Sequence, residues 1–388
     1  MTYMKNISHY INAIESRAAR RKAERNDTSY SRHIVIIESD DWGSIRMPSK
    51  KVLEELKHNN HSFFDGIGYD RYDTLASNTD LEVLIEALSS VKDSEGHAAM
   101  LTMNCVVANP DFAKIRQSDF REYHYELFTE TLKRYPHHDR SFALWQEGME
   151  AGVLHPQFHG REHLNAQMWL GLLRKGCKPV LDSFEKEVIS VVVDKKDDAR
   201  QHSLAAYNLA DEQEYAFAKK SVREGLDLFE QLFGYRSVSM IAPNYTWDTA
   251  IEDEALRCGV RYLQGSRNQR HSYYVMRNGG QTEFRYTGQR NGNGQIYMVR
   301  NCSFEPSENA NKNADYCLAQ IEKVFKRGQA AIISSHRQNF IGELYPENRD
   351  NNIRQFKSLL TTIVKKYPDV LFMTSDQYGK MLETNGIQ

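Results

Sequence analysis

The chain has 388 residues, of which 40% are apolar, so it is long enough to bury a full hydrophobic core. Its 50 basic and 52 acidic residues give a formal net charge of -2, which argues against a protein that binds nucleic acid through overall charge. No apolar run approaches the roughly 20 residues that a membrane-spanning helix needs. These quantities indicate a globular protein with one large domain or two ordinary ones.

The N-terminal segment and the cysteines bear on location. Residues 1–10 lack the continuous apolar stretch of a signal peptide, and the five cysteines are scattered without a CxxC pair. We therefore expect a cytoplasmic protein with reduced thiols. The basic run at 16–25 follows apolar residues at helical spacing, and we expect residues 1–30 to form a helical extension. That extension is either a solvated helix or a peripheral contact with an anionic membrane surface.

Strand-like apolar runs alternate with helix-like segments through the rest of the chain. The pattern predicts strands at 33–37, 98–104, 152–158, 237–242, 261–264, 295–300, 330–335 and 370–373. It predicts helices at 51–57, 80–89, 120–134, 141–151, 165–175, 211–233, 249–258, 313–327 and 354–367. Several glycines at 271–295 are typical of hairpin turns.

This alternation predicts an α/β fold with a parallel sheet and crossover helices. Seven or eight strand–helix units favour a barrel over an open sheet. We expect a single catalytic domain over residues 31–388, with a small β insertion on the barrel rim at about 268–300. Active sites of such barrels lie at the carboxyl ends of the strands. Polar residues collect at those positions in this chain: Asp40, Asp41, Asn104, Asn109, His159, His163, Asn244, Tyr245, His336 and Arg337.

Two histidines and an aspartate form the strongest candidate metal site. His159 and His163 are four residues apart, which places them on one face of a helical turn. With Asp41 they offer two imidazoles and one carboxylate, a set suited to zinc, with cobalt, nickel and manganese as alternatives. The overlapping pair His155 and His159 has the same spacing, but His155 lies within a predicted strand. A metal held here would lower the pKa of a bound water toward ~7, with Asp40 as general base.

The order of these motifs resembles that of the polysaccharide deacetylase (NodB-homology) family. Glu-Ser-Asp-Asp-Trp-Gly at 38–43 is similar to the family's first motif, which implies Asp40 as base and Asp41 as metal ligand. His-Gly-Arg-Glu-His at 159–163 fits the metal-binding His-x-x-x-His motif. His336 ends a strand, as does the general-acid histidine of the last motif. The family fold is a deformed, often seven-stranded (β/α) barrel, consistent with the strand count.

The third family motif, Arg-x-Pro-Tyr, is matched only in part by Ala242-Pro243-Asn244-Tyr245. In the family the arginine of this motif orients the base. Its role is therefore either absent here or taken by another arginine, with three candidates: Arg161, Arg236 and Arg337. We also expect five side chains near the site to contact a substrate: Trp42, Asn104, Arg161, Tyr245 and Arg337.

The resemblance implies a metal-dependent hydrolase that removes an acetyl group from a carbohydrate, as an N- or O-deacetylase in cytoplasmic steps of surface polysaccharide metabolism. One alternative is an amidase or a glycoside hydrolase on the same fold. A retaining glycoside hydrolase needs two carboxylates about 5 Å apart, from among four acids: Glu38, Asp40, Glu162 and Asp248. The other alternative is a degenerate, non-catalytic carbohydrate-binding module. Nothing in the sequence indicates an oligomeric state.

Overall fold

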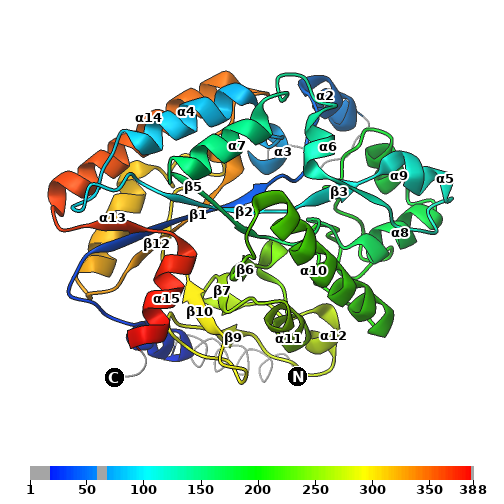
Figure 1. The fold of residues 1–388 in the computed structure, drawn as a ribbon. Helices are drawn as coiled ribbons and strands as arrows, with labels where there is room; N and C mark the ends of the chain where they lie inside the picture. Colours follow the sequence, from blue (N-terminus) through cyan, green and yellow to red (C-terminus); the bar gives the residue numbers. More distant parts are fainter. Residues whose placement is uncertain (1–17, 59–67, 386–388) are drawn as a thin grey trace, which may run out of the picture.

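A nine-stranded parallel sheet organises the computed structural model, which describes residues 18–58 and 68–385 (Figure 1). The strand order is β10-β7-β6-β5-β2-β1-β12-β11, and β13 pairs with the first residues of β1. The long strand β1 (Ile34–Trp42) is buried along its whole length. The other strands are β2 (Leu101–Cys105), β5 (Leu154–Phe158), β6 (Ser239–Ile241), β7 (Tyr262–Gly265), β10 (Ile296–Val299), β11 (Cys302–Ser303), β12 (Ala331–His336) and β13 (Leu371–Met373).

The α/β class and the parallel sheet are confirmed, but the predicted barrel does not close through hydrogen bonds between the described strands. Strands β10 and β11 are the two edges of the sheet, yet only Arg300 and Asn301 separate them along the chain. Because consecutive Cα atoms are about 3.8 Å apart, the two edges lie within about 11 Å of each other. The sheet is therefore strongly curled. Ile36, Met298 and Ile332, from opposite ends of the strand order, share one buried cluster inside the curl.

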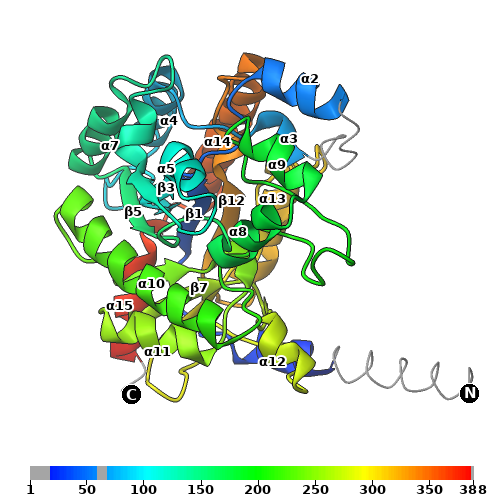
Figure 2. The ribbon, with the colours of Figure 1, turned by 90° about the vertical axis from the view of Figure 1, so that its right-hand side faces the viewer.

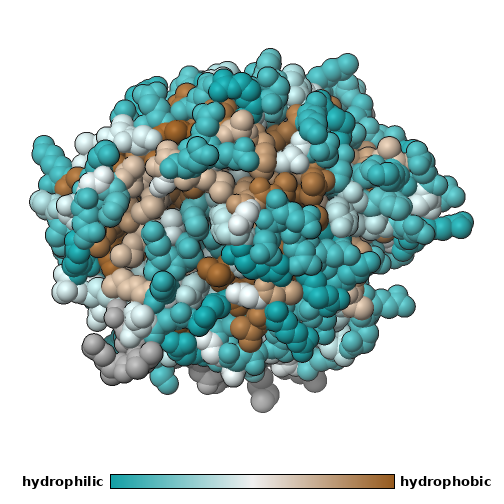
Figure 3. Space-filling model, viewed as in Figure 1, coloured by the Kyte–Doolittle hydropathy of each residue, from teal (hydrophilic) through white to brown (hydrophobic). Residues whose placement is uncertain are grey.

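Helices enclose this curled sheet (Figures 1 and 2). Helices α4 (Asn78–Ser89), α7 (Ser141–Glu150) and α14 (Pro346–Lys366) cover one side, and α10 (Glu212–Phe233) packs against α11 (Thr249–Arg257) on another. The remaining helices are α2 (Lys50–His58), α3 (Gly68–Tyr72), α5 (Phe112–Gln117), α6 (Phe128–Leu132), α8 (Ala166–Arg174), α9 (Lys178–Phe184), α12 (Tyr273–Arg277), α13 (Ala314–Phe325) and α15 (Ser375–Asn385). Hydrophilic residues dominate the face drawn in Figure 3, with hydrophobic ones in small groups.

The helix predicted at 120–134 is wrong in its first half. Asp119 and Phe120 have φ angles of 50° and 59°, outside the right-handed helical region. Tyr125–Leu127 forms β4, which pairs antiparallel with β3 (Ala108–Pro110), and only α6 is helical. The aromatic residues of this stretch are compatible with a strand as well as with a helix. Pairing with β3 therefore determines that Tyr125–Leu127 forms a strand.

The structure describes all of the insertion expected at about 268–300 and part of the helical extension expected at 1–30. In the glycine-rich stretch, β8 (Asn268–Gln269) pairs antiparallel with β9 (Glu283–Phe284), with α12 between them, while β10 belongs to the central sheet. At the N-terminus, residues 18–26 are helical, and the apolar residues predicted to precede them lie outside the described residues. No helix in the described ranges combines the length and apolarity needed to cross a bilayer.

Candidate active site

Two consecutive aspartates at the end of β1 line one cavity of about 400 Å³. Neighbouring side chains of a regular strand point to opposite faces of a sheet, so the backbone must depart from strand geometry. Asp41 has a φ of 73°, and Gly43 has a φ of 79°. The amide of Asn109 holds this turn, because its Oδ1 accepts from the N–H of Ile45 at 2.9 Å and its Nδ2 donates to the carbonyl of Gly43 at 2.9 Å. Asp40 and Asp41 thereby reach the same space.

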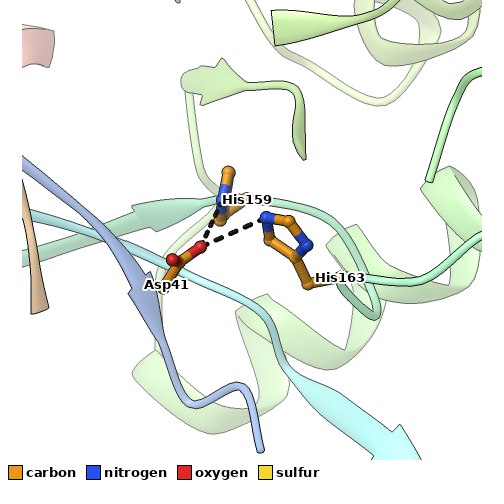
Figure 4. A group of neighbouring side chains, drawn as sticks. All are labelled: Asp41, His159 and His163. Carbon is orange, nitrogen blue, oxygen red and sulfur yellow. Dashed lines mark ion pairs between the residues drawn. The ribbon is translucent and has the colours of Figure 1, made fainter. Parts of the chain in front are cut away.

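Asp41, His159 and His163 form a buried cluster with the donor set of a divalent metal site (Figure 4). Oδ1 of Asp41 lies 3.4 Å from Nε2 of His159 and 3.1 Å from Nε2 of His163. Nδ1 of His159 donates to the carbonyl of Ile241 at 2.9 Å, so its Nε2 presents a lone pair. That Nε2 faces a carboxylate oxygen and has no hydrogen-bond donor among the described residues. A cation between Nε2 of His159 and Oδ1 of Asp41 would interact favourably with both atoms. The residues therefore fit the divalent metal that the family resemblance implies.

The two histidines meet through a loop, and the helical turn that the spacing predicts is wrong. Residues 159–163 connect β5 to α8 and contain no helix. Gly160 has a φ of 111°, and a Cβ there would lie 3.1 Å from the carbonyl oxygen of Glu162. The carbonyl of Arg161 accepts from the N–H of Ala108 at 2.8 Å, which fixes the loop to the segment after β2. Glycine at position 160 is therefore what lets both rings turn toward Asp41.

The electrostatics of the cluster favour the protonation states that bind a metal. Burial, and then the charge of Arg46, lowers the pKa of His163 to about 4, so the ring is neutral at pH 7. Burial acts to raise the pKa of Asp41, but Arg46 and the two imidazoles outweigh it and hold that pKa well below its usual value. Nη2 of Arg46 lies 3.2 Å from Asp41, and its Nε lies 3.2 Å from Asp73. Arg46 is therefore a buried cation beside the proposed metal ligand.

Asp40 is held by Arg300, an arginine that the sequence reasoning missed. Nη1 and Nη2 of Arg300 donate to the two carboxylate oxygens of Asp40, each at 2.6 Å. Its Nε donates to Glu38 at 2.6 Å. Nδ2 of Asn104 adds a bond of 2.8 Å to Oδ1 of Asp40. Arg300 directly follows β10, so the curl of the sheet carries it across the interior to the end of β1.

Arg300 has opposite consequences for its two carboxylates. Burial acts to raise the pKa of Asp40, but the charge and hydrogen bonds of Arg300 outweigh it, so the pKa of Asp40 is lowered. Glu38 is completely buried, and burial prevails over Arg300, so the pKa of Glu38 is raised. Asp40 is therefore an ionised acceptor at the cavity wall, backed by a second acid that does not reach the cavity.

His336 faces Asp40 from the neighbouring strand. The two residues are register partners of β1 and β12, and Nε2 of His336 lies 3.8 Å from Oδ2 of Asp40. Nδ1 of His336 lies 2.6 Å from Oε1 of Glu305 and 3.0 Å from the hydroxyl of Tyr69. Burial acts to lower the pKa of His336, but Glu305 and then Asp40 outweigh it and raise that pKa well above its usual value. His336 is therefore a protonated imidazolium at neutral pH.

Two of the residues expected to bind substrate lie close to this group. Tyr245 lines the cavity, and its hydroxyl accepts from Nη1 of Arg300 at 2.9 Å. Its backbone N–H donates to the carbonyl of Ala242 at 3.0 Å, so this N–H is not available as a donor to a substrate oxygen. Asn104 is completely buried behind Asp40 and donates to both Asp40 and Gln264. Asn104 holds the carboxylate of Asp40 and does not border the cavity, so the structure gives no support to the expected substrate contact.

Three residues expected to bind substrate face away from the cavity. Trp42 is 1% exposed and packs in the hydrophobic core. Arg161 is buried and pairs with Glu162 at 2.6 Å. Arg337 is completely buried and pairs with Asp73 at 2.8 Å. None of the three borders the cavity, so the structure gives no support to the expectation that they contact substrate.

Two alternatives left open by the sequence are also resolved by contacts. Arg236 pairs with Asp227 at 2.7 Å on the surface, so none of the three candidate arginines reaches Asp40, whereas Arg300 does. His155 lies 3.0 Å from Asp376 and does not border the cavity. The pair that faces Asp41 is therefore His159 and His163.

Comparisons with known proteins found no matching family model and no curated relative. Among solved structures, the chain is similar to a putative polysaccharide deacetylase from Mycobacterium smegmatis, with 11% identity and a TM-score of 0.42 over 93% of this chain and 94% of that one. A family 4 carbohydrate esterase from Streptomyces lividans matches with 10% identity and a TM-score of 0.39, over 91% and 96%.

A third similar structure is neither a deacetylase nor an esterase. A 4-alpha-glucanotransferase from Thermococcus litoralis has 10% identity and a TM-score of 0.42, and the match covers 90% of this chain but only 40% of that one. All three likenesses are weak, and the functional assignment rests on the geometry of the site.

Proposed function

We propose that the protein is a metal-dependent hydrolase that removes an acetyl group from a carbohydrate. The observation that carries this proposal is the meeting of three groups in one cavity: the Asp41–His159–His163 cluster, the ionised Asp40 and the protonated His336. We further propose that it acts as an N- or O-deacetylase in cytoplasmic steps of surface polysaccharide metabolism. The five unpaired cysteines suit a reducing compartment.

Asp41, His159 and His163 would hold the metal, with zinc as the first candidate. A bound divalent metal lowers the pKa of its water and polarises the acyl carbonyl. Asp40 serves as general base and takes a proton from the attacking water. Asp40 accepts three hydrogen bonds, from two nitrogens of Arg300 and from Asn104, and two carboxylate oxygens offer about four acceptor sites. One acceptor site is left for that proton.

His336 serves as general acid. Glu305 holds its Nδ1–H, which leaves the protonated Nε2 directed toward Asp40 and the cavity. Nε2–H is then placed to protonate the leaving amine or alkoxide. The proposed base and acid lie on neighbouring strands, with Nε2 of His336 3.8 Å from Oδ2 of Asp40, so both can reach one acyl group in the cavity.

The contacts favour deacetylation over the glycoside hydrolase alternative. Of the four acids considered for that reaction, only Asp40 borders the cavity. Glu38 is enclosed behind Arg300, Glu162 pairs with Arg161, and Asp248 bonds the hydroxyl of Tyr215. An amidase acting on a non-sugar substrate uses the same residues and stays the second candidate. The ionised base and protonated acid argue against a purely binding role.

Metal content and acetate release test this proposal together. We expect purified protein to bind one zinc, cobalt, nickel or manganese ion per chain, and a chelator to abolish acetate release from N-acetylated sugars. His163→Ala should lose both properties. His155→Ala is the matched control, because His155 is near in sequence but lies outside the cluster, so it should keep both. A protein that binds none of the four metals, or that releases acetate unchanged after chelation, would refute the proposal.

A further inference from the structure

One cation of the cavity has no part in the proposed reaction. Arg270 borders the cavity and its side chain is exposed. Its guanidinium has no carboxylate within ion-pair distance and no hydrogen-bond acceptor in the described part of the chain. Two other arginines near the cavity do have carboxylate partners: Arg300 pairs with Asp40, and Arg46 pairs with Asp41. Arg270 is therefore a charge presented to the cavity and left without a counter-ion.

The backbone of Arg270 is fixed even though its side chain is not. Its N–H donates to the carbonyl of Tyr245 at 3.2 Å, and its carbonyl accepts from the N–H of Trp247 at 3.0 Å. The side chain of the preceding Gln269 donates to the carbonyl of Trp247 at 3.1 Å. These bonds join the start of the β8–β9 unit to the loop that follows β6. That loop contains Asn244 and Tyr245, which line the same cavity. The guanidinium thus emerges from a rigid part of the cavity rim.

The other charged groups that face the cavity do not neutralise Arg270. Asp40 and Asp41 are bound by Arg300 and Arg46, and Glu308 pairs with Lys312 at 2.6 Å.

The carboxyl of Asp70 accepts from the hydroxyl of Ser190 at 2.8 Å. Burial, and then the charge of Arg270, lowers the pKa of His202, which also borders the cavity. Nη1 of Arg46, itself 5% exposed, has no acceptor among the described residues. The cavity therefore has one guanidinium without a counter-ion, that of Arg270, and a spare donor on Arg46.

We propose that Arg270 binds an anionic group of the substrate, a carboxylate or a phosphate, carried beside the acyl group that is removed. Guanidinium suits both groups, because its planar fork donates two parallel hydrogen bonds to either. The substrate class is then an acidic saccharide, as a uronate-containing sugar or a sugar phosphate, in place of a neutral one. This inference rests on the proposed deacetylase function.

Binding to metal-free protein tests Arg270 without the chemistry. Three probes are titrated by calorimetry: N-acetylglucosamine, N-acetylglucosamine 1-phosphate, and a disaccharide of N-acetylglucosamine and glucuronate. We expect wild-type protein to prefer at least one charged probe, Arg270→Gln to weaken that binding tenfold or more, and Arg270→Lys to restore part of it. Arg277→Gln is the matched control, because Arg277 is an exposed arginine on α12 that does not border the cavity. It should leave all three affinities unchanged.

The outcomes separate this inference from the proposed function. Equal binding of neutral and charged probes, or full affinity in Arg270→Gln, overturns the role of Arg270 even if the metal-loaded protein releases acetate. Binding that depends on Arg270, together with no acetate release from any probe by metal-loaded protein, supports the anion site and counts against the deacetylase. The charged probe that loses more affinity in Arg270→Gln identifies the group as phosphate or carboxylate.

Discussion

Arg300→Gln is the sharpest test of the proposed base. The substitution removes the cation shared by Glu38 and Asp40, whose side chains are at most 4% exposed. Removing one partner of a buried ion pair costs about 3–5 kcal/mol, because a charge is left buried without compensation. At about 2 °C per kcal/mol for a large domain, Tm should fall by roughly 6–10 °C. A carboxylate displaced by about 1 Å costs roughly 100-fold in rate, so we expect kcat for acetate release to fall by about that factor.

Two further variants separate lost stability from lost positioning. Arg300→Gln combined with Glu38→Gln removes one positive and one negative charge, so Tm should recover toward wild type while kcat stays low. Arg200→Gln is the control for losing any buried arginine, because Arg200 is 5% exposed and pairs with Asp198 at 2.8 Å, away from the cavity. It should lower Tm and leave kcat unchanged. Wild-type kcat and KM in folded Arg300→Gln would refute the assignment of Arg300 as the residue that positions Asp40.

Two other predictions concern the acid and the histidine loop. In Glu305→Gln, His336 loses the carboxylate that favours its protonated form, so its pKa falls and the alkaline limb of the kcat/KM profile moves to lower pH; an unmoved limb would mean that His336 is not the titrating acid. Gly160→Ala places a Cβ 3.1 Å from the carbonyl of Glu162 at a φ of 111°, a strain of about 1–3 kcal/mol. Zinc affinity, measured by competition with a chelator, should fall tenfold or more, and unchanged affinity would show that the loop accommodates alanine.

Local patterns predict most of the secondary structure and the metal cluster. The helix predicted at 211–233 corresponds to α10, and Asp211 caps it by accepting from the N–H groups of Gln213 and Glu214. Asp41, His159 and His163 follow strand ends, and parallel strands bring such ends together. The roles of these residues remain predictions, whereas their proximity is a property of the fold.

Local patterns do not identify the residues that position the proposed acid and base. Arg300 lies 260 residues from Asp40 and belongs to no short motif. The available signal was its place at the end of the strand predicted at 295–300, the same end at which the other polar candidates collect. Glu305 lacks even that signal, because it follows the short edge strand β11 and reaches His336 only through the pairing of β11 with β12. Local patterns also did not indicate that Trp42 would be buried in the core, because the backbone turn at Asp41 arises from contacts distant in sequence.

The path of the chain from one edge of the sheet to the other has a consequence for synthesis. Strand β1 pairs with β12 and β13, which lie far from it along the chain and are made much later. Until residue 300 has left the ribosome, Glu38 and Asp40 have no counter-ion, and burying both charges would be strongly unfavourable. A nascent chain should therefore leave the Glu38–Asp40 end of β1 unburied until Arg300 has been made. Such distant pairings also favour slow folding, so the cavity lined by Asp40 and His336 would form only after β12 has been made.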